Sequence, residues 1–259
     1  MGNSQMNASK IREEIIFGFK VFSDHLSKIP IRQSNTSVIN TISPNSYGLS
    51  TRNLALDQAL KSTDYLVLDG VYFSLAAILL RYKNIQKNQG PDIFYHFIER
   101  LNRMSGKAFF LGSTINTLDL IKKQAEFRYP NISVYTYSPP FTDVFSEQQE
   151  LDIVNAINSI RPDIVFVGMT CPKQEIWSIR NRKRVDAGLI ICIGNVFDWF
   201  AGTQKPIHPF WFSLRLGWFI RIILRPEIFK RNIGNQLKFF WDLLLVFIRL
   251  KKEPIYRPF

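Results

Sequence analysis

The chain has 259 residues, of which 46% are hydrophobic, so it can bury one large core and is not a low-complexity sequence. Its two cysteines have no paired spacing, which argues against a disulfide framework and indicates a reducing compartment. The net charge of +12 indicates an anionic partner, either a membrane surface or nucleic acid. The first residues lack the apolar core of a signal peptide, so we expect the protein to be made and kept in the cytoplasm.

Predicted elements alternate along the chain. An amphipathic helix is expected over residues 10–26, because Ile11, Ile15 and Phe19 recur at helical spacing. Short apolar runs then predict strands at residues 37–42, 65–68, 107–111, 132–137, 163–167 and 189–193. Helical stretches lie between them at residues 49–61, 71–82, 90–104, 115–127, 146–160 and 172–182. Strands alternating with helices predict an α/β fold with a largely parallel, Rossmann-like sheet and helices on both faces.

The stretch around residues 163–177 is the most informative part of the chain. Gly168 ends a strand whose composition suits burial on both faces, and Pro172 suits the first turn of the next helix. Lys173, Gln174 and Glu175 follow in that turn, at the carboxyl end of the strand, where ligands bind in open α/β sheets. We therefore predict that all three contact a substrate. A plain solvated turn is the alternative.

Polar or glycine-containing turns follow five of the predicted strands and would lie on one edge of the sheet. Glycine lets a backbone approach a phosphate closely, and helix N-termini favour its charge. The sequence has no Gly-x-Gly-x-x-Gly or Walker motif, no Asp-x-Asp and no His/Cys cluster. We therefore expect no cofactor and no tightly bound metal, while a nucleotide diphosphate held by scattered glycines stays open. The turn residues concerned are Ser43, Asn45, Asp69, Gly70, Gly112, Ser113, Gly168, Gly194 and Asn195.

Asp69 is the acid that most suits catalysis. A carboxylate directly after an apolar strand, at the ligand edge, is placed to act as a general base, although an Asp-Gly turn explains the same residues equally well. Asp198 is a weaker candidate, since capping or orienting its helix would also account for it. Cys171 has no obvious His partner, so we interpret it as a spectator thiol.

The character of the chain changes after Gly202. From residue 203 onward there are eleven Lys or Arg residues and three acids, so +8 of the +12 charge lies in the last fifth. Two segments, residues 210–224 and 236–250, are rich in Trp, Phe and Leu, but charges interrupt them and they are too short to span a membrane. We predict an α/β core over residues 1–202 and a helical appendage over 203–259. The appendage would bind anionic lipid peripherally, at the cytoplasmic face of the membrane. Packing on the core, or a dimer interface in a homo-oligomer, is the alternative role.

Six short motifs occur in an order that resembles the WecG/TagA/CpsF family of bacterial glycosyltransferases, over about residues 37–231. They are Ser-Pro-Asn at 43–45, Leu-Asp-Gly at 68–70, Gly-x-Asp at 90–92, Phe-Leu-Gly-Ser at 110–113, Pro-Lys-Gln-Glu-x-Trp at 172–177 and Phe-Asp-x-x-Ala-Gly at 197–202. The resemblance implies transfer of a sugar from a UDP-sugar to an undecaprenyl-diphosphate-linked sugar, with inversion, during assembly of cell-surface polymers.

The same resemblance implies roles for particular residues. Asp69 would be the catalytic base, Ser43 stands where the family usually has Thr, and Asn45 and Gln174 would line the same cleft. Arginines of the appendage would meet a substrate diphosphate, and the candidates here are Arg221, Arg225 and Arg231.

This chain departs from the family pattern within the appendage. Ile207-His208-Pro209 replaces Arg-Ala-Pro, and Leu216-Gly217-Trp218 replaces Leu-Glu-Trp. Arg225 replaces the Glu of a Glu-Pro pair, and Ile228 replaces the Arg that usually stands two residues after that proline. These departures concern acceptor recognition, whereas the motifs of the core site are kept.

The sequence therefore predicts an inverting, metal-independent glycosyltransferase that acts at a membrane surface. Two other classes of protein stay open. A nucleic-acid-binding protein would explain the basic charge, but the basic residues are interleaved with Trp, Phe and Leu, which suits lipid better. A non-catalytic partner in polymer assembly would need a degenerate cleft, and the presence of Asp69 and Gln174 argues against it.

Overall fold

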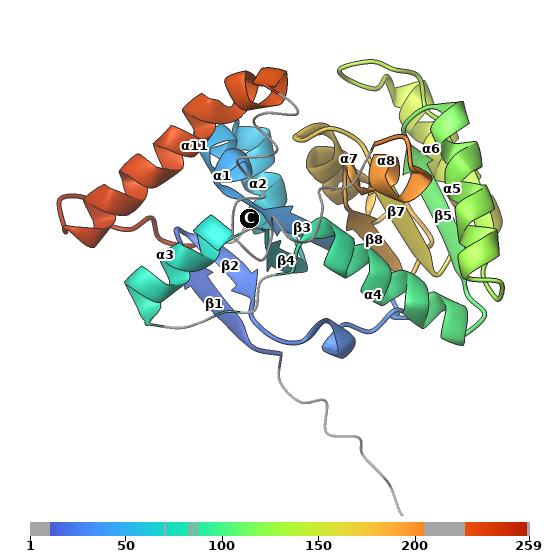
Figure 1. The fold of residues 1–259 in the computed structure, drawn as a ribbon, viewed down its shortest axis with the longest axis horizontal. Helices are drawn as coiled ribbons and strands as arrows, with labels where there is room; N and C mark the ends of the chain where they lie inside the picture. Colours follow the sequence, from blue (N-terminus) through green and yellow to red (C-terminus); the bar gives the residue numbers. More distant parts are fainter. Residues whose placement is uncertain (1–10, 70, 83–84, 86–87, 205–225, 258–259) are drawn as a thin grey trace, which may run out of the picture.

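A computed structural model describes residues 11–69, 71–82, 85, 88–204 and 226–257. Its centre is a six-stranded sheet in which all neighbouring strands are parallel, in the order β4-β3-β8-β7-β5-β6 (Figure 1). The predicted α/β fold with a parallel sheet is therefore confirmed. The strands are β3 (Ser37–Ile42), β4 (Tyr65–Leu68), β5 (Lys107–Gly112), β6 (Ser133–Tyr137), β7 (Ile164–Gly168) and β8 (Leu189–Cys192).

Helices cover both faces of the sheet because alternate strand residues point to opposite sides. In β5, Ala108 and Phe110 pack with α4 (Gly90–Arg103), α5 (Ile115–Arg128) and α8 (Val196–Ala201). Phe109 and Leu111 of the same strand face the other way and pack with α6 (Glu147–Ile160) and α7 (Lys173–Asn181). The strands are apolar on both sides, as a doubly covered parallel sheet requires.

The helix predicted over residues 10–26 is wrong. This segment forms an antiparallel hairpin of β1 (Glu13–Ile16) and β2 (Phe19–Phe22), followed by the short 3-10 helix η1 (Leu26–Lys28). Phe17 and Gly18 join the strands with φ angles of 51° and 75°, the left-handed pair typical of a tight two-residue hairpin turn. The apolar spacing fits a helix, but the aromatic and β-branched residues on either side of a glycine favour strands.

Residues 49–61 also differ from the expected single helix. They are divided between α1 (Pro44–Ser50) and α2 (Leu54–Lys61), because the Asn53 side chain caps α2 by accepting a hydrogen bond from Leu56 N at 3.0 Å.

A separate core joins the hairpin, α1, α2, α3 (Val71–Arg81) and the C-terminal helix α11 (Pro226–Phe247). Four aromatic rings form its centre: Phe73 stacks on Phe239 at a centroid distance of 5.1 Å, with Phe17 and Tyr47 around them. Phe239 belongs to α11, and its side chain is completely buried. The inner face of α11 is therefore part of the core, and Figure 1 shows this helix lying alongside α1.

A buried acid strengthens the contact between α11 and the core. Asp242 is 1% exposed, and its carboxylate accepts hydrogen bonds from Tyr47 Oη at 2.9 Å and Lys251 Nζ at 2.7 Å, as well as from Lys238 Nζ. Burial alone would raise the pKa of Asp242, but these three hydrogen bonds outweigh it and leave the pKa below its usual value. Asp242, which interrupts the apolar segment 236–250, is thus a buried anchor of the helix.

The outer face of α11 is apolar and exposed. Its exposed residues are Leu237, Phe240, Trp241, Leu244 and Phe247, and Ile248 follows directly after the helix. We call these six side chains the outer face of α11. Within the described parts of the chain, no helix is both long enough and apolar enough to cross a membrane.

Candidate functional site

Asp69 and Ser43 lie at the ends of neighbouring strands. Ile42 of β3 is paired in register with Leu68 of β4, and Asp69 N donates to Ile42 O at 2.9 Å. The next residue on each strand is therefore Ser43 or Asp69, side by side at the carboxyl edge. Asp69 is partly buried, which suits a carboxylate that must reach a substrate without being fully exposed to water. The structure thus brings together these two predicted site residues.

Ser43 also starts helix α1. Its Oγ accepts from Ser46 N at 3.3 Å, and Ser46 Oγ accepts from Ser43 N at 2.8 Å, which is a reciprocal capping box. Pro44 occupies the first helical position, where its missing N–H costs no hydrogen bond. Asn45 follows in the first turn, half-buried, and its Oδ1 accepts from Asn235 Nδ2 of α11 at 2.9 Å. The beginning of α1 is thereby held in one position.

The connection from β7 to α7 places Gln174 beside the end of β8. Gln174 is 6% exposed, and a Cβ built on Gly194 would lie only 3.7 Å from Gln174 Oε1. Gln174 Nε2 donates to Glu175 Oε1 at 2.8 Å. Within the described residues, Gln174 Oε1 and Glu175 Oε2 are buried without a hydrogen-bond partner. A buried polar atom without a partner costs stability, so these atoms mark a place where a ligand would be favourable.

Glu175 follows Gln174 in the first turn of α7, and Cys171 lies just before that helix. Burial raises the pKa of the Glu175 carboxyl, so its neutral form is favoured. Burial is the main cause that raises the pKa of the Cys171 thiol, and the neighbouring Glu175 carboxyl acts in the same direction. A thiol with a raised pKa is a poor nucleophile, which agrees with the interpretation of Cys171 as a spectator.

Lys173 is engaged by a neighbouring loop. Its Nζ donates to the carbonyl oxygen of Thr142 and lies 3.6 Å from the ring centroid of Phe145. Burial lowers the pKa of Lys173. The ammonium group therefore joins α7 to the β6–α6 connection, a contact between residues about thirty positions apart that no local pattern could indicate.

The physical reason for a glycine differs among the predicted site positions. A Cβ at Gly168 would lie 2.3 Å from the Phe197 ring, and one at Gly112 would lie 2.6 Å from Gly168 O, so packing alone accounts for both. Gly112 also has a φ of 116°, which side chains rarely adopt. Gly194, with a φ of 53°, has no atom closer than 3.6 Å to a built Cβ. At Gly194 the positive φ, and not a steric clash, is therefore what favours glycine.

Ser113 and Asp198 take part in local hydrogen bonds. Ser113 O accepts from Ser138 Oγ at 2.8 Å, which ties the end of β5 to the end of β6. Asp198 Oδ2 accepts from Gln204 Nε2 at 2.8 Å, and its main-chain oxygen accepts from Gln204 N at 3.2 Å. Asp198 therefore holds the chain that leaves α8.

The strand order determines how far apart the site residues are. Along the edge, the end of β4 with Asp69 is followed by the ends of β3, β8, β7 and β5. Four steps of about 4.8 Å separate Asp69 from Gly112 and Ser113 by roughly 19 Å. The carboxyl edge therefore has two ends, one with Asp69, Ser43 and Asn45 and the other with Gly112 and Ser113. Gln174 and Gly194 lie between them.

Of the three arginines predicted for substrate binding, the structure describes only Arg231. Arg221 and Arg225 lie outside the described residues, as do Gly70, Ile207 and Gly217, and the side chain of Ile228 is likewise not described. Arg231 lies on α11 and is exposed. Among the described residues, no group of three His, Cys, Asp or Glu side chains could hold a metal ion.

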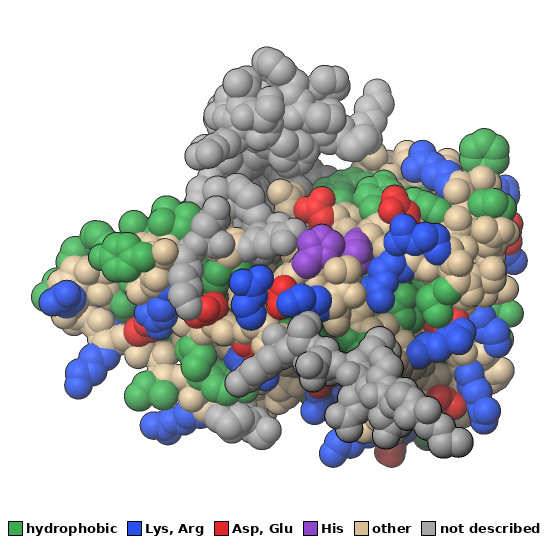
Figure 2. Space-filling model, turned by 90° about the horizontal axis from the view of Figure 1, so that it is seen from below, with side chains coloured by type: hydrophobic (Ala, Val, Ile, Leu, Met, Phe, Trp, Pro, Cys, Tyr) green, Lys and Arg blue, Asp and Glu red, His purple; other side chains and the backbone are tan. Residues whose placement is uncertain are grey.

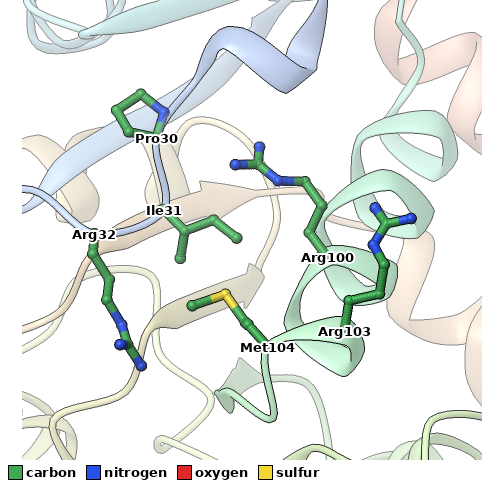
Figure 3. Close-up of a pocket in the computed structure, with 6 residues that line it drawn as sticks. All are labelled: Pro30, Ile31, Arg32, Arg100, Arg103 and Met104. Carbon is green, nitrogen blue, oxygen red and sulfur yellow. The ribbon is translucent and has the colours of Figure 1, made fainter. Parts of the chain in front are cut away.

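A hollow of about 480 Å³ lies away from this edge, lined by Pro30, Ile31, Arg32, Arg100, Arg103 and Met104 (Figure 3). It is near the amino ends of the strands, because Arg32 precedes β3 and Met104 precedes β5. Arg32 Nε donates to Asp163 Oδ1 at 2.6 Å, and Arg100 Nη1 donates to Ile29 O at 2.8 Å. These two arginines stabilise the fold, so the hollow is not the candidate site.

The face seen in Figure 2 has mixed charge. Among the side chains drawn in colour there, Lys and Arg are interspersed with Asp and Glu.

Comparison with known proteins gives consistent results. The model of the "Glycosyl transferase WecG/TagA/CpsF family" matches residues 19–253. A Bacillus subtilis (strain 168) protein named N-acetylglucosaminyldiphosphoundecaprenol N-acetyl-beta-D-mannosaminyltransferase is 26% identical over 213 residues, 82% of this chain and 81% of that protein. Proteins of the same name from Bacillus spizizenii and Staphylococcus aureus (strain NCTC 8325 / PS 47) are 22% and 24% identical, over 82% and 74% of this chain and 81% and 74% of their own lengths.

Proposed function

The chain belongs to the WecG/TagA/CpsF glycosyl transferase family, and from this premise we propose that it transfers an N-acetylhexosamine from a UDP-sugar to a polyprenyl-diphosphate-linked sugar. The names of the relatives favour N-acetylmannosamine as the transferred sugar and N-acetylglucosaminyl-diphosphoundecaprenol as the acceptor. The product would enter assembly of a cell-surface polymer. The observation that carries the proposal is the pairing of β3 with β4, which sets Asp69 beside Ser43 within the segment that the family model matches.

The proposed reaction is a single displacement. The acceptor hydroxyl gives its proton to the Asp69 carboxylate while its oxygen bonds to the anomeric carbon of the donor. The bond from that carbon to the diphosphate breaks at the same time, and UDP leaves with the electron pair. Attack from the opposite side inverts the anomeric centre, so an α-linked donor gives a β-linked product. The β-linkage in the names of the relatives agrees with this stereochemistry.

The two ends of the carboxyl edge suggest how the donor would lie. A nucleotide sugar placed along the edge puts its sugar near Asp69 and its nucleotide toward Gly112 and Ser113. The diphosphate would then lie near Gly194 and Gln174, where backbone N–H groups and the arginines of the 203–259 segment could stabilise its charge. Among the arginines of this segment, Arg231 on α11 is exposed and carries a charge that could contribute. No divalent metal is needed in this scheme.

We further propose that the outer face of α11 holds the enzyme on the cytoplasmic surface of the membrane. An acceptor with a polyprenyl tail cannot leave the bilayer, so the active site must come to it. Trp241 and Leu237 are each 59% exposed on that face, and aromatic rings suit the boundary between lipid and water. Each basic residue near an anionic leaflet adds about 1 kcal/mol of binding.

The test of the activity uses a panel of UDP-sugars with N-acetylglucosaminyl-diphosphoundecaprenol and other lipid-diphosphate acceptors, followed by determination of the product linkage. We expect transfer from one or a few UDP-N-acetylhexosamines with inversion. Retention of anomeric configuration, or no transfer from any UDP-sugar to any lipid-linked acceptor, would contradict the proposal.

Membrane binding is tested separately by Trp241→Ser in sedimentation with vesicles containing anionic phospholipid. The matched control is Phe127→Ser on α5, because Phe127 is 86% exposed and belongs to a different side of the sheet. We expect Trp241→Ser to weaken sedimentation and the control to leave it unchanged. Equal binding by both variants would show that the outer face of α11 does not meet the membrane.

A further inference from the structure

Three side chains connect α11 to the first turn of α1 and to the segment between α1 and α2. Arg52 Nη2 donates to Asn235 Oδ1 at 2.6 Å, and Asn235 Nδ2 donates to Asn45 Oδ1 at 2.9 Å. Asn235 lies on α11 and is 5% exposed, whereas Asn45 is half-buried and Arg52 is exposed, so both contacts are partly buried. We call these residues the Arg52–Asn235–Asn45 relay.

The direction of every hydrogen bond in the relay follows from Arg52. A guanidinium can only donate, so the atom of Asn235 that it meets must be the oxygen. The other end of that amide is then the NH₂ group, which must meet an acceptor, and Asn45 can offer only its Oδ1. The NH₂ group of Asn45 is therefore turned away from α11. Arg52 therefore allows only one orientation of the two amides.

The backbone around the relay leaves little freedom. At Gly48 the helices α1 and α11 approach so closely that a Cβ would lie 2.1 Å from Asn235 O and 2.5 Å from Asn235 Cα. No side chain fits between them, so the Asn235 backbone rests directly on α1. The position of Asn235 relative to Asn45 is therefore determined by the packing of two helices and not by a flexible loop.

We propose that Asn235 is a positioning residue that holds Asn45 with its amide NH₂ group, and not its oxygen, toward the substrate. The substrate atom met by Asn45 is then a hydrogen-bond acceptor, an oxygen of the sugar or of the diphosphate. The inference rests on the proposed function, in which Asn45 lines the Asp69 end of the carboxyl edge. It adds that α11 completes this end of the site, because Asn45 has the required orientation only when α11 is seated on α1.

The test variant is Asn235→Asp, which keeps the shape of the side chain and its contact with Arg52. Its carboxylate cannot donate to Asn45 Oδ1, so the Asn45 amide turns round and presents its oxygen to the substrate. We expect kcat/KM for sugar transfer to fall roughly three- to a hundred-fold, with the lower end for a lost hydrogen bond to a neutral sugar oxygen and the upper end for one to a charged diphosphate oxygen. The melting temperature should stay close to that of the wild type, because the Arg52 pair remains. Gln236→Glu on the same helix is the matched control for the added charge and should leave kcat/KM unchanged.

A double-mutant cycle with Asn45→Ala decides whether Asn235 acts through Asn45. We expect Asn235→Asp to lower kcat/KM in the wild-type background and to have no further effect in the Asn45→Ala background. If the two losses are additive in an active enzyme, Asn235 acts by another route and the inference is wrong while the proposed function stands. If the wild type transfers no sugar to any acceptor, the proposed function fails, and the inference fails with it.

Discussion

Substituting Phe239 by Ala measures whether α11 belongs to the folded core. The Phe239 side chain is 0% exposed, and its ring lies 5.1 Å from Phe73, 5.5 Å from Tyr47 and 5.7 Å from Phe17, measured between centroids. Truncating a fully buried Phe leaves a cavity and costs about 4 kcal/mol of unfolding free energy. For a chain of this size, each kcal/mol lowers the melting temperature by about 2–4 °C, so we expect a decrease of roughly 8–16 °C.

The assay is urea-induced unfolding followed by far-ultraviolet circular dichroism, with a thermal melt as a second measurement. Leu237→Ala is the matched control, because Leu237 is on the same helix but 59% exposed. We expect the control to change the unfolding free energy by less than about 1 kcal/mol. A loss below about 1 kcal/mol for Phe239→Ala, or equal losses for both variants, would refute the packing of α11 on the core. The same packing predicts that removing the chain after Gly202 destabilises the protein, and the proposed membrane contact of the outer face of α11 predicts that this truncation also releases it from membranes.

The remaining predictions concern the acids and the metal requirement. Asp69→Asn should keep the fold and UDP binding but lower turnover by roughly 10²–10⁴, as for loss of a general base, and near-normal turnover would remove Asp69 from that role. Transfer activity should survive EDTA, because no sequence motif supplies a carboxylate pair for Mg²⁺ or Mn²⁺, and an absolute dependence on added metal would contradict this. The pKa of Asp242 is lowered in the folded protein, so its stabilising effect is present above the unfolded value of about 3.9 and is lost as pH falls further. The stability difference between the wild type and Asp242→Asn, measured by urea unfolding, should therefore shrink below about pH 4, and a constant difference would argue against a charged Asp242. Burial raises the pKa of Glu175, so Glu175→Gln should become more stable relative to the wild type as pH rises above about 4.3, and a relative loss would indicate a stabilised charge.

Local chemistry was enough to predict the sheet and the edge at which a ligand would bind. Short apolar runs such as residues 65–68 and 164–167, rich in β-branched and aromatic or aliphatic residues, favour strands, and a glycine or an acid directly after them marks the strand end. Because parallel strands all end at one edge, Asp69 and Ser43 could be assigned to the same side of the sheet from the sequence alone. The hairpin at residues 13–22 shows the limit of this reasoning, since the same apolar residues fit both helical and strand spacing.

Tertiary structure decided the distances and partners, because they depend on contacts between residues far apart in the chain. The strand order sets Asp69 beside Ser43 and far from Gly112, and no local pattern encodes that order. Gly168 faces the Phe197 ring, so packing accounts for a glycine that the sequence suggested for a phosphate. Asn45 and Asn235 are 190 positions apart, yet their hydrogen bond decides which atoms of Asn45 can meet a substrate. An amphipathic sequence such as that of α11 likewise predicts one buried face, but only the packed core determines what that face is buried against.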